Sequence, residues 1–316
     1  DCAGTWGGSA VEDECSVCGG SGPAENFTCN GFKPETKDAL QTAVDLRYDD
    51  NSTALPTYGE INSWDVSLIT DMADLFSGKN TFNDDIGNWD VSNVTTMERI
   101  FHQAYSFNQD LSTWDVSNVT TMERMFSQVT SYNQNLSTWD VSSVINMKEM
   151  FRYSYYFNQD LSTWDVSSVT TMERMFQGAQ TFKQDISGWD VSNVTNMDMM
   201  FYCDGNQAGS FNQDISGWDV SNVTDMGRMF YSQRQFNQNI SSWDVSSVTD
   251  MQYMFYQAIV FNQDISIWDV SNVTNMKGMF SFHPNNPGTF NQDISGWDVS
   301  NVTNMDNMFD GADALS

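Results

Sequence analysis

Residues 290–305 read FNQDISGWDVSNVTNM, and residues 211–226 repeat this phrase with Asp in place of the last Asn. A catalytic motif is needed once, whereas a structural unit is needed many times, so the repetition indicates architecture. The tetrapeptide WDVS occurs ten times, at a spacing of 25 residues except for two steps of 29. A fixed period of roughly 20 to 50 residues is typical of a solenoid, in which each repeat packs on its neighbours. We therefore expect ten stacked coils.

Two different periods lie inside each coil. Residues 111–116 follow the pattern L-x-x-W-x-V, in which alternate residues point to opposite faces, and this predicts a strand. Residues 122–129 place Met, Met, Phe and Val at positions i, i+3, i+4 and i+7, which predicts a short helix or at least a helical turn. Stacking would bury the Trp, Met and Phe side chains in one continuous core. The sequence thus predicts an α/β repeat solenoid with one parallel β-sheet face and short helices on the other.

The chain divides into three parts. Residues 59–316 carry the repeats, and residues 32–58 contain an amphipathic segment, 34–47, that predicts a helix capping the open end of the solenoid, followed by a linker. Residues 1–31 are rich in Gly and Cys and too polar to make a core, so they predict a disulfide module and an oxidising, extracellular compartment. Zinc is the weaker alternative, because the one C-x-x-C has no second pair and no His nearby. The four cysteines are Cys2, Cys15, Cys18 and Cys29.

The charge of the chain excludes some partners. Lys and Arg total 13 against 42 Asp and Glu, which gives a formal net charge of −29. Phosphate backbones and anionic lipids would be repelled, so we expect no binding to nucleic acid. No run of 18 or more apolar residues occurs, and we expect no direct membrane insertion. The disulfides predicted for residues 1–31 favour an extracellular or cell-surface location.

The sequence pattern of the coils also resembles that of a known family. From residue 59 to the end, the coils repeat the pattern W-D-V-S-N-V-T-x-M-x-x-M-F followed by F-N-Q-D-I-S. This pattern resembles the BspA-like leucine-rich-repeat surface-protein family. The resemblance implies a right-handed leucine-rich-repeat coil, found on secreted or cell-surface proteins that serve in adhesion, attachment or surface layers. The family carries no catalytic residues to transfer. The segment DCAGTWGGSAVEDECSVCGG is similar to short Cys/Gly modules found beside such repeats in large extracellular proteins.

One aspartate follows the Trp of every coil. If the coils stack in register, these carboxylates form a column at strand spacing, where like charges are destabilising. Two readings stay open: each Asp accepts hydrogen bonds from nearby Ser, Asn or backbone groups, or the column binds a hard cation, Ca²⁺ above all. The candidate ligands are Asp65, Asp90, Asp115, Asp140, Asp165, Asp190, Asp219, Asp244, Asp269 and Asp298.

Sequons for N-glycosylation recur along the chain. Six are N-V-T in the turn after the expected strand, so turn chemistry alone also explains them. Successive coils would bring these asparagines too close together for full occupancy, and we expect partial glycosylation. The sequons begin at Asn26, Asn51, Asn93, Asn118, Asn135, Asn193, Asn222, Asn239, Asn272 and Asn301.

Two coils carry four extra residues at the same place, within residues 202–210 and 281–289. Insertions at one position map to one edge of a solenoid, which is often a binding edge, although tolerated surface loops explain them as well. The first insertion contains Cys203, the odd cysteine, for which we expect an exposed thiol or an intermolecular bridge.

Nothing in the sequence indicates an enzyme. His102 and His283 lie far apart, and no nucleotide-binding or zinc-protease motif occurs. The carboxylates sit in repeated, equivalent surroundings, whereas a catalytic pair needs unlike ones. We expect no cofactor other than Ca²⁺.

Two functions fit the repeats. The first is an extracellular structural protein that self-assembles into a fibre, sheath or surface layer through head-to-tail contacts of an uncapped solenoid. The alternative is a monomeric cell-surface adhesion or recognition module, which presents its sheet face or its insertion edge to a protein or glycan.

Overall fold

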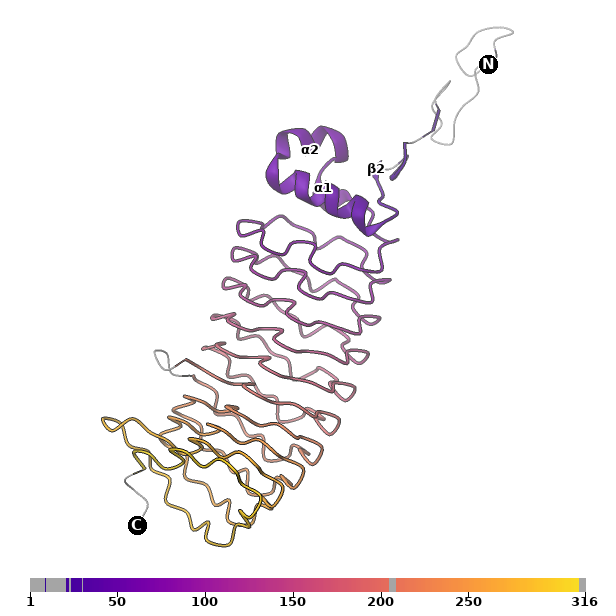
Figure 1. Cartoon of the computed structure of the whole chain (residues 1–316). Helices are drawn as coiled ribbons and strands as arrows, with labels where there is room; N and C mark the ends of the chain where they lie inside the picture. Colours follow the sequence, from indigo (N-terminus) through magenta and orange to yellow (C-terminus); the bar gives the residue numbers. More distant parts are fainter. Residues whose placement is uncertain (1–8, 10–20, 23, 30, 205–208, 313–316) are drawn as a thin grey trace.

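The computed structural model describes residues 9, 21–22, 24–29, 31–204 and 209–312. This part of the chain is an elongated stack of coils with a pair of helices at its N-terminal end (Figure 1). A short antiparallel hairpin, β1 (Phe27–Thr28) with β2 (Gly31–Phe32), comes first. Helix α1 spans Lys37–Asp49, helix α2 spans Asn51–Tyr58, and a 3-10 turn spans Ile61–Ser63. No helix among the described residues is long and apolar enough to cross a membrane.

Helix α1 covers the first coil, as the prediction of a capping helix requires. Thr36 caps its N-terminus through a side-chain oxygen that accepts the Ala39 N–H at 3.2 Å. The Gln41 side chain donates to the carbonyl oxygen of Leu75 at 3.1 Å. In later coils the equivalent carbonyl accepts a backbone N–H of the preceding coil, so the cap replaces a missing neighbour. The buried residues of this helix are Leu40, Ala43 and Val44.

The sequence does not predict helix α2. Pro56 lies inside it and only Ala54 is buried, so neither an apolar period nor good helix formers mark the segment. Asp50 starts it, because its side chain accepts the backbone N–H of Thr53 at 3.2 Å.

The Met-Phe segment of each coil is a run of β-turns, and the prediction of a helix there is wrong. The apolar side chains of residues 122–129 are buried as expected. However, the Met125 N–H closes a turn on the Met122 carbonyl at 3.1 Å, and Arg124 has a left-handed φ of 54°. The Arg124 N–H leaves the coil and donates to the Lys148 carbonyl of the next coil at 2.9 Å. An α-helix would use these groups internally, so stacking between coils replaces the helix.

Parallel pairing between coils exists, but not where the strand is predicted. Residues 112–113 and 117–118 are turns, and residues 114–116 between them join no bridge. The pairing comes just after the N-V-T turn, as in the one-residue parallel bridge between Thr96 and Thr121. Nine such bridges join the ten described coils, but no continuous strand forms in them. The fold is therefore a regular repeat of about 25 residues; its sheet face is not confirmed, and its hand stays a prediction.

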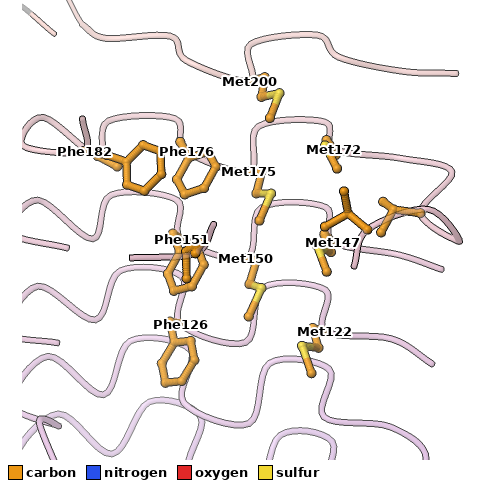
Figure 2. Close-up of a cluster of buried hydrophobic side chains, with 14 of the residues drawn as sticks. Met122, Phe126, Met147, Met150, Phe151, Met172, Met175, Phe176, Phe182 and Met200 are labelled. Carbon is orange, nitrogen blue, oxygen red and sulfur yellow. The ribbon is translucent and has the colours of Figure 1, made fainter. Parts of the chain in front are cut away.

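Buried side chains of successive coils stack in columns. Figure 2 shows Phe126, Phe151 and Phe176 in one column, with Met150 and Met175 in another beside it. The ring centroids of Phe126 and Phe151 lie 5.6 Å apart, with an angle of 4° between the ring planes. These aromatic and thioether side chains are almost fully buried, so they form the core that stacking was expected to create.

The Trp of each coil bonds to the coil before it. The indole N–H of Trp164 donates to the Leu136 carbonyl oxygen at 2.9 Å in a buried contact. That oxygen also accepts the backbone N–H of Trp139 at 3.1 Å, so both of its lone pairs are used. Nine of the ten coil tryptophans make this bond, at 2.8 to 3.1 Å. Trp64 differs, because its buried indole nitrogen has no acceptor among the described residues.

The difference between Trp164 and Trp64 allows the contribution of the indole hydrogen bond to the free energy of unfolding to be measured. Trp164→Phe removes the bond and part of the ring, so we expect the free energy of unfolding to fall by roughly 2 to 3 kcal/mol. Trp64→Phe removes the same atoms without breaking a hydrogen bond, and should cost about 1 kcal/mol less. Urea unfolding followed by circular dichroism measures both losses. Equal losses would show that the bond adds nothing to the packing.

Candidate binding groove

Two columns of side chains border the Met-Phe face of the solenoid. We name them by their distance from the Met eight residues after the Trp of each coil, such as Met172 after Trp164. In the fifth to tenth coils the Met+2 column consists of Arg174, Met199, Arg228, Tyr253, Gly278 and Asn307. All of these residues have a positive φ, between 53° and 59°. The same turn therefore repeats in every one of these coils. In the same coils the Met+5 column consists of Gln177, Tyr202, Tyr231, Tyr256, Ser281 and Asp310.

In the first half of the solenoid the columns carry charged groups. The Glu149 side chain is 1% exposed, and the Arg124 guanidinium donates to both of its oxygens at 3.0 Å. Arg152 and Arg174 approach the same carboxylate at 3.1 and 3.6 Å. Burial acts to raise the pKa of Glu149, but hydrogen bonding from Arg124 and the three positive charges outweigh it and lower this pKa. The network therefore keeps a buried carboxylate ionised.

In the second half tyrosines replace these charges. Tyr202, Tyr231 and Tyr256 stack in successive coils, with ring centroids 4.5 and 4.4 Å apart. Tyr253 meets Tyr256 edge to face at 5.7 Å, and the Arg228 guanidinium lies 5.5 Å from the centroid of the Tyr253 ring. Burial raises the pKa of Tyr202 and Tyr231, so these phenols stay neutral hydrogen-bonding groups.

A groove of about 540 Å³ opens along this half of the solenoid, and all its lining residues belong to the two columns. In the ninth coil both columns carry small residues, Gly278 and Ser281, so neither column has a large side chain at that level. The ring of Tyr253 lies across Gly278, where an added Cβ would overlap it. Tyr253 and Tyr256 stand on one side of this level, and Asn307 and Asp310 of the tenth coil on the other.

A half-buried carboxyl group lies behind Arg228. The side chain of Asp198 is 13% exposed and approaches Arg174 at 3.7 Å and Arg228 at 3.8 Å. Gly227 makes room for it, since a Cβ there would lie 2.9 Å from Asp198 Oδ1 and 3.2 Å from Asp225 Oδ1. Burial and the charge of Asp225 raise the pKa of Asp198 to about 6.

This raised pKa makes stability depend on pH. Below about pH 4 Asp198 is neutral in both the folded and the unfolded chain, whereas above about pH 6 the folded chain must hold an ionised, poorly solvated carboxylate. We expect Asp198→Asn to raise the free energy of unfolding by roughly 1 to 3 kcal/mol at pH 8 and by little at pH 4. Urea midpoints at the two pH values measure the effect. Asp306→Asn, at the equivalent but exposed position of the tenth coil, is the control. The same gain at both pH values would contradict the assignment.

The aspartates after the Trp residues make turns. The Asp115 carboxylate accepts the Ser117 hydroxyl at 2.6 Å and the Ser117 backbone N–H at 3.1 Å, and these bonds lower its pKa. All ten aspartates of this column accept the backbone N–H of the Ser two residues later, at 3.0 to 3.1 Å. In the part of the chain that the structure describes, no group of three or more His, Cys, Asp or Glu is placed to hold a metal ion. Calcium binding by the column stays a prediction.

The sequon asparagines also take part in the fold. The Asn118 side-chain amide donates to a serine carbonyl of the preceding coil at 2.8 Å, and the other five N-V-T asparagines do the same at 2.7 to 2.9 Å. Asn135 and Asn239 instead accept a serine N–H within their own turn. Asn26 caps a loop, and Asn51 begins α2. A glycan on an N-V-T site would attach to a nitrogen that joins two coils, and glycosylation stays a prediction.

The expectation of an exposed thiol at Cys203 is wrong. Cys203 is 1% exposed, because Gln233 of the next coil packs against it with Nε2 3.6 Å from Sγ. Burial raises the pKa of Cys203 to about 12, and a buried thiol with so little thiolate is a poor partner for an intermolecular bridge. Three of the other cysteines, Cys2, Cys15 and Cys18, lie outside the described residues, so the disulfide module that they would form with Cys29 stays a prediction.

Sequence reasoning does not predict the tyrosines of the groove. Tyr202 and Ser281, the first residues of the segments 202–210 and 281–289, line the groove. Residues 205–208 of the first segment lie outside the described part of the chain, so a binding edge at the insertions stays a prediction. A signal for the tyrosines exists, because M-F-Y recurs in three successive coils, at 200–202, 229–231 and 254–256.

Comparison with known proteins identifies a family that the chain matches. Three overlapping stretches, residues 48–161, 134–207 and 204–316, match the sequence model of a family described as "Mycoplasma protein of unknown function, DUF285". Together these stretches cover every coil. The family is related to the BspA-like surface proteins, which the sequence pattern of the coils resembles. Searches of curated proteins and of solved structures gave no match.

Proposed function

We propose that this chain, which belongs to the DUF285 family, is an extracellular recognition module that binds a protein or glycan at a cell surface. The observation that carries the proposal is the groove of about 540 Å³ between the Met+2 and Met+5 columns. Its volume lies in the range of sites for small or extended ligands, and its lining combines aromatic rings with a few polar groups, as such sites do. The relation to BspA-like surface proteins supports a role in adhesion.

The rigidity of the solenoid supports the same function. The backbone N–H groups of Met199, Arg228 and Tyr253 each donate to a carbonyl of the next coil at 2.7 to 2.8 Å. The groove side chains therefore stand on a backbone that is already fixed, and a ligand need not order it on binding.

Self-assembly into a fibre, sheath or surface layer is the second candidate. In the tenth coil Met305 and Phe309 are each 40% exposed, although their counterparts in the earlier coils are buried. This surface would accept another coil, whether of the same chain or of a second copy. A head-to-tail contact meets an obstacle at the other end, because α1 already covers the first coil and occupies the Leu75 carbonyl. The groove therefore supports recognition better than the coil ends support a polymer.

Binding to extracellular material tests the first candidate. Wild-type protein should bind saturably to insoluble matrix from the source culture, measured by depletion from solution. Replacing both Tyr231 and Tyr256 with Ala removes two stacked rings, and we expect affinity to fall at least about tenfold. Tyr156→Ala is the control, since this ring is 66% exposed and lies outside the groove. Equal binding by all three proteins would sink the proposal, provided that circular dichroism shows the variants folded.

Sedimentation velocity at micromolar concentration separates the two candidates. The recognition module should give one monomeric species across the concentration range. A series of oligomers that grows with concentration and is lost in a Met305→Glu, Phe309→Glu variant would instead favour self-assembly, because the added charges oppose burial of that surface.

A further inference from the structure

We propose that the occupant of the groove is a neutral oligosaccharide, an inference that rests on the proposed function and narrows it to one ligand class. The first reason is how the aromatic stack ends. Tyr202, Tyr231 and Tyr256 pack face to face, but in the ninth coil Ser281 holds the equivalent position and contributes no ring. The stack thus stops at Tyr256, which lines the groove together with Ser281 and with Asp310 of the tenth coil. A pyranose ring, which has one apolar C–H face, continues such a stack.

The second reason is the polarity of the lining. Ser281 and Asn307 offer a hydroxyl and an amide group, and the tyrosine hydroxyls add a row of groups that both donate and accept. The Gln177 amide is already bonded to Arg152 and Tyr153. A sugar carries many hydroxyls of the same dual character around its apolar faces. A purely apolar ligand would displace water from the groove and leave these polar groups without partners, which is costly.

The third reason is charge. Arg228 is the one Arg or Lys side chain that lines the groove as described, and it is already engaged by Asp198 at 3.8 Å and by the Gln252 side chain at 3.2 Å. Asp310 stands in the same groove, and the chain as a whole carries a net charge of −29. A sulfated or uronic polymer would meet no free cation and would be repelled. The ligand should therefore be neutral.

The fourth reason concerns peptides. An extended peptide commonly binds by adding a strand to an exposed backbone edge. Along the groove the outward N–H groups of the Met+2 column are taken: that of Tyr253 donates to the Lys277 carbonyl at 2.7 Å, and that of Gly278 to the Asp306 carbonyl at 2.9 Å. The groove thus offers side chains rather than a backbone edge, which favours a saccharide over a peptide strand.

Two glycines provide a matched pair of variants. Gly278→Ala would displace the ring of Tyr253, a lining residue, whereas Gly178→Ala would displace the ring of Tyr153, which does not line the groove and meets it through the amide of Gln177 at 3.4 Å. Both glycines have positive φ, 59° and 71°, so the backbone strain of the two substitutions is similar. A larger loss of binding in Gly278→Ala than in Gly178→Ala then reports on the Tyr253 end of the groove and not on backbone strain.

Affinity electrophoresis in gels that contain a neutral polysaccharide tests the inference. The probes are β-1,4-glucan, α-mannan and xylan, each with the wild-type protein, the two glycine variants and Tyr156→Ala. We expect at least one polysaccharide to retard the wild type, Gly178→Ala and Tyr156→Ala, and to retard Gly278→Ala at least about fivefold less. Retardation of none of the proteins, or of all four equally, would overturn the saccharide assignment.

Periodate separates this inference from the proposed function, because it cleaves the vicinal diols of sugars and leaves most of a protein ligand intact. Binding to the source matrix that depends on Tyr231 and Tyr256 and is abolished by periodate would support a saccharide. Groove-dependent binding that survives periodate but is lost after protease treatment would overturn the saccharide and leave the recognition module standing. Matrix binding that does not depend on the groove would overturn both.

Discussion

The structure depends on hydrogen bonding between coils. Alternate backbone N–H groups of each coil donate to carbonyls of the next, and the indole of each later Trp donates to a carbonyl of the coil before. Because a buried backbone group without a partner is costly, neighbouring coils must stay in register. The register then places equivalent side chains above one another, so the rings of Phe126 and Phe151 stack nearly parallel. The cap obeys the same constraint, since Gln41 supplies the donor that no preceding coil provides.

Register also converts small sequence differences into surface features. The Met+2 and Met+5 positions are free to vary because their side chains do not enter the core. Charged residues there give the buried Glu149 network, whereas tyrosines there give an aromatic stack. Two small residues in one coil, Gly278 and Ser281, interrupt both columns at one level. A solenoid can thus acquire a groove without any change in its backbone.

Two buried carboxylates in or beside these columns have pKa values shifted in opposite directions, although burial alone would raise both. Glu149 is the more buried, but three arginines surround it and its pKa is lowered. Asp198 has two arginines at longer distances and Asp225 beside it, and its pKa rises to about 6. The direction of each pKa shift is therefore decided by the distance and the sign of the neighbouring charges, and not by burial alone.

The sequence by itself determined the repeat, the number of coils, the capping helix and the residues of the core, because apolar periodicity and burial are read directly from residue type. Tertiary structure decided the rest. Apolar spacing at i, i+3, i+4 and i+7 fits a helix and a run of turns equally well, and bonds to the next coil, which no local pattern encodes, select the turns. The groove likewise needs residues of six coils at adjacent heights, and only stacking in register brings Tyr256, Ser281 and Asp310 together.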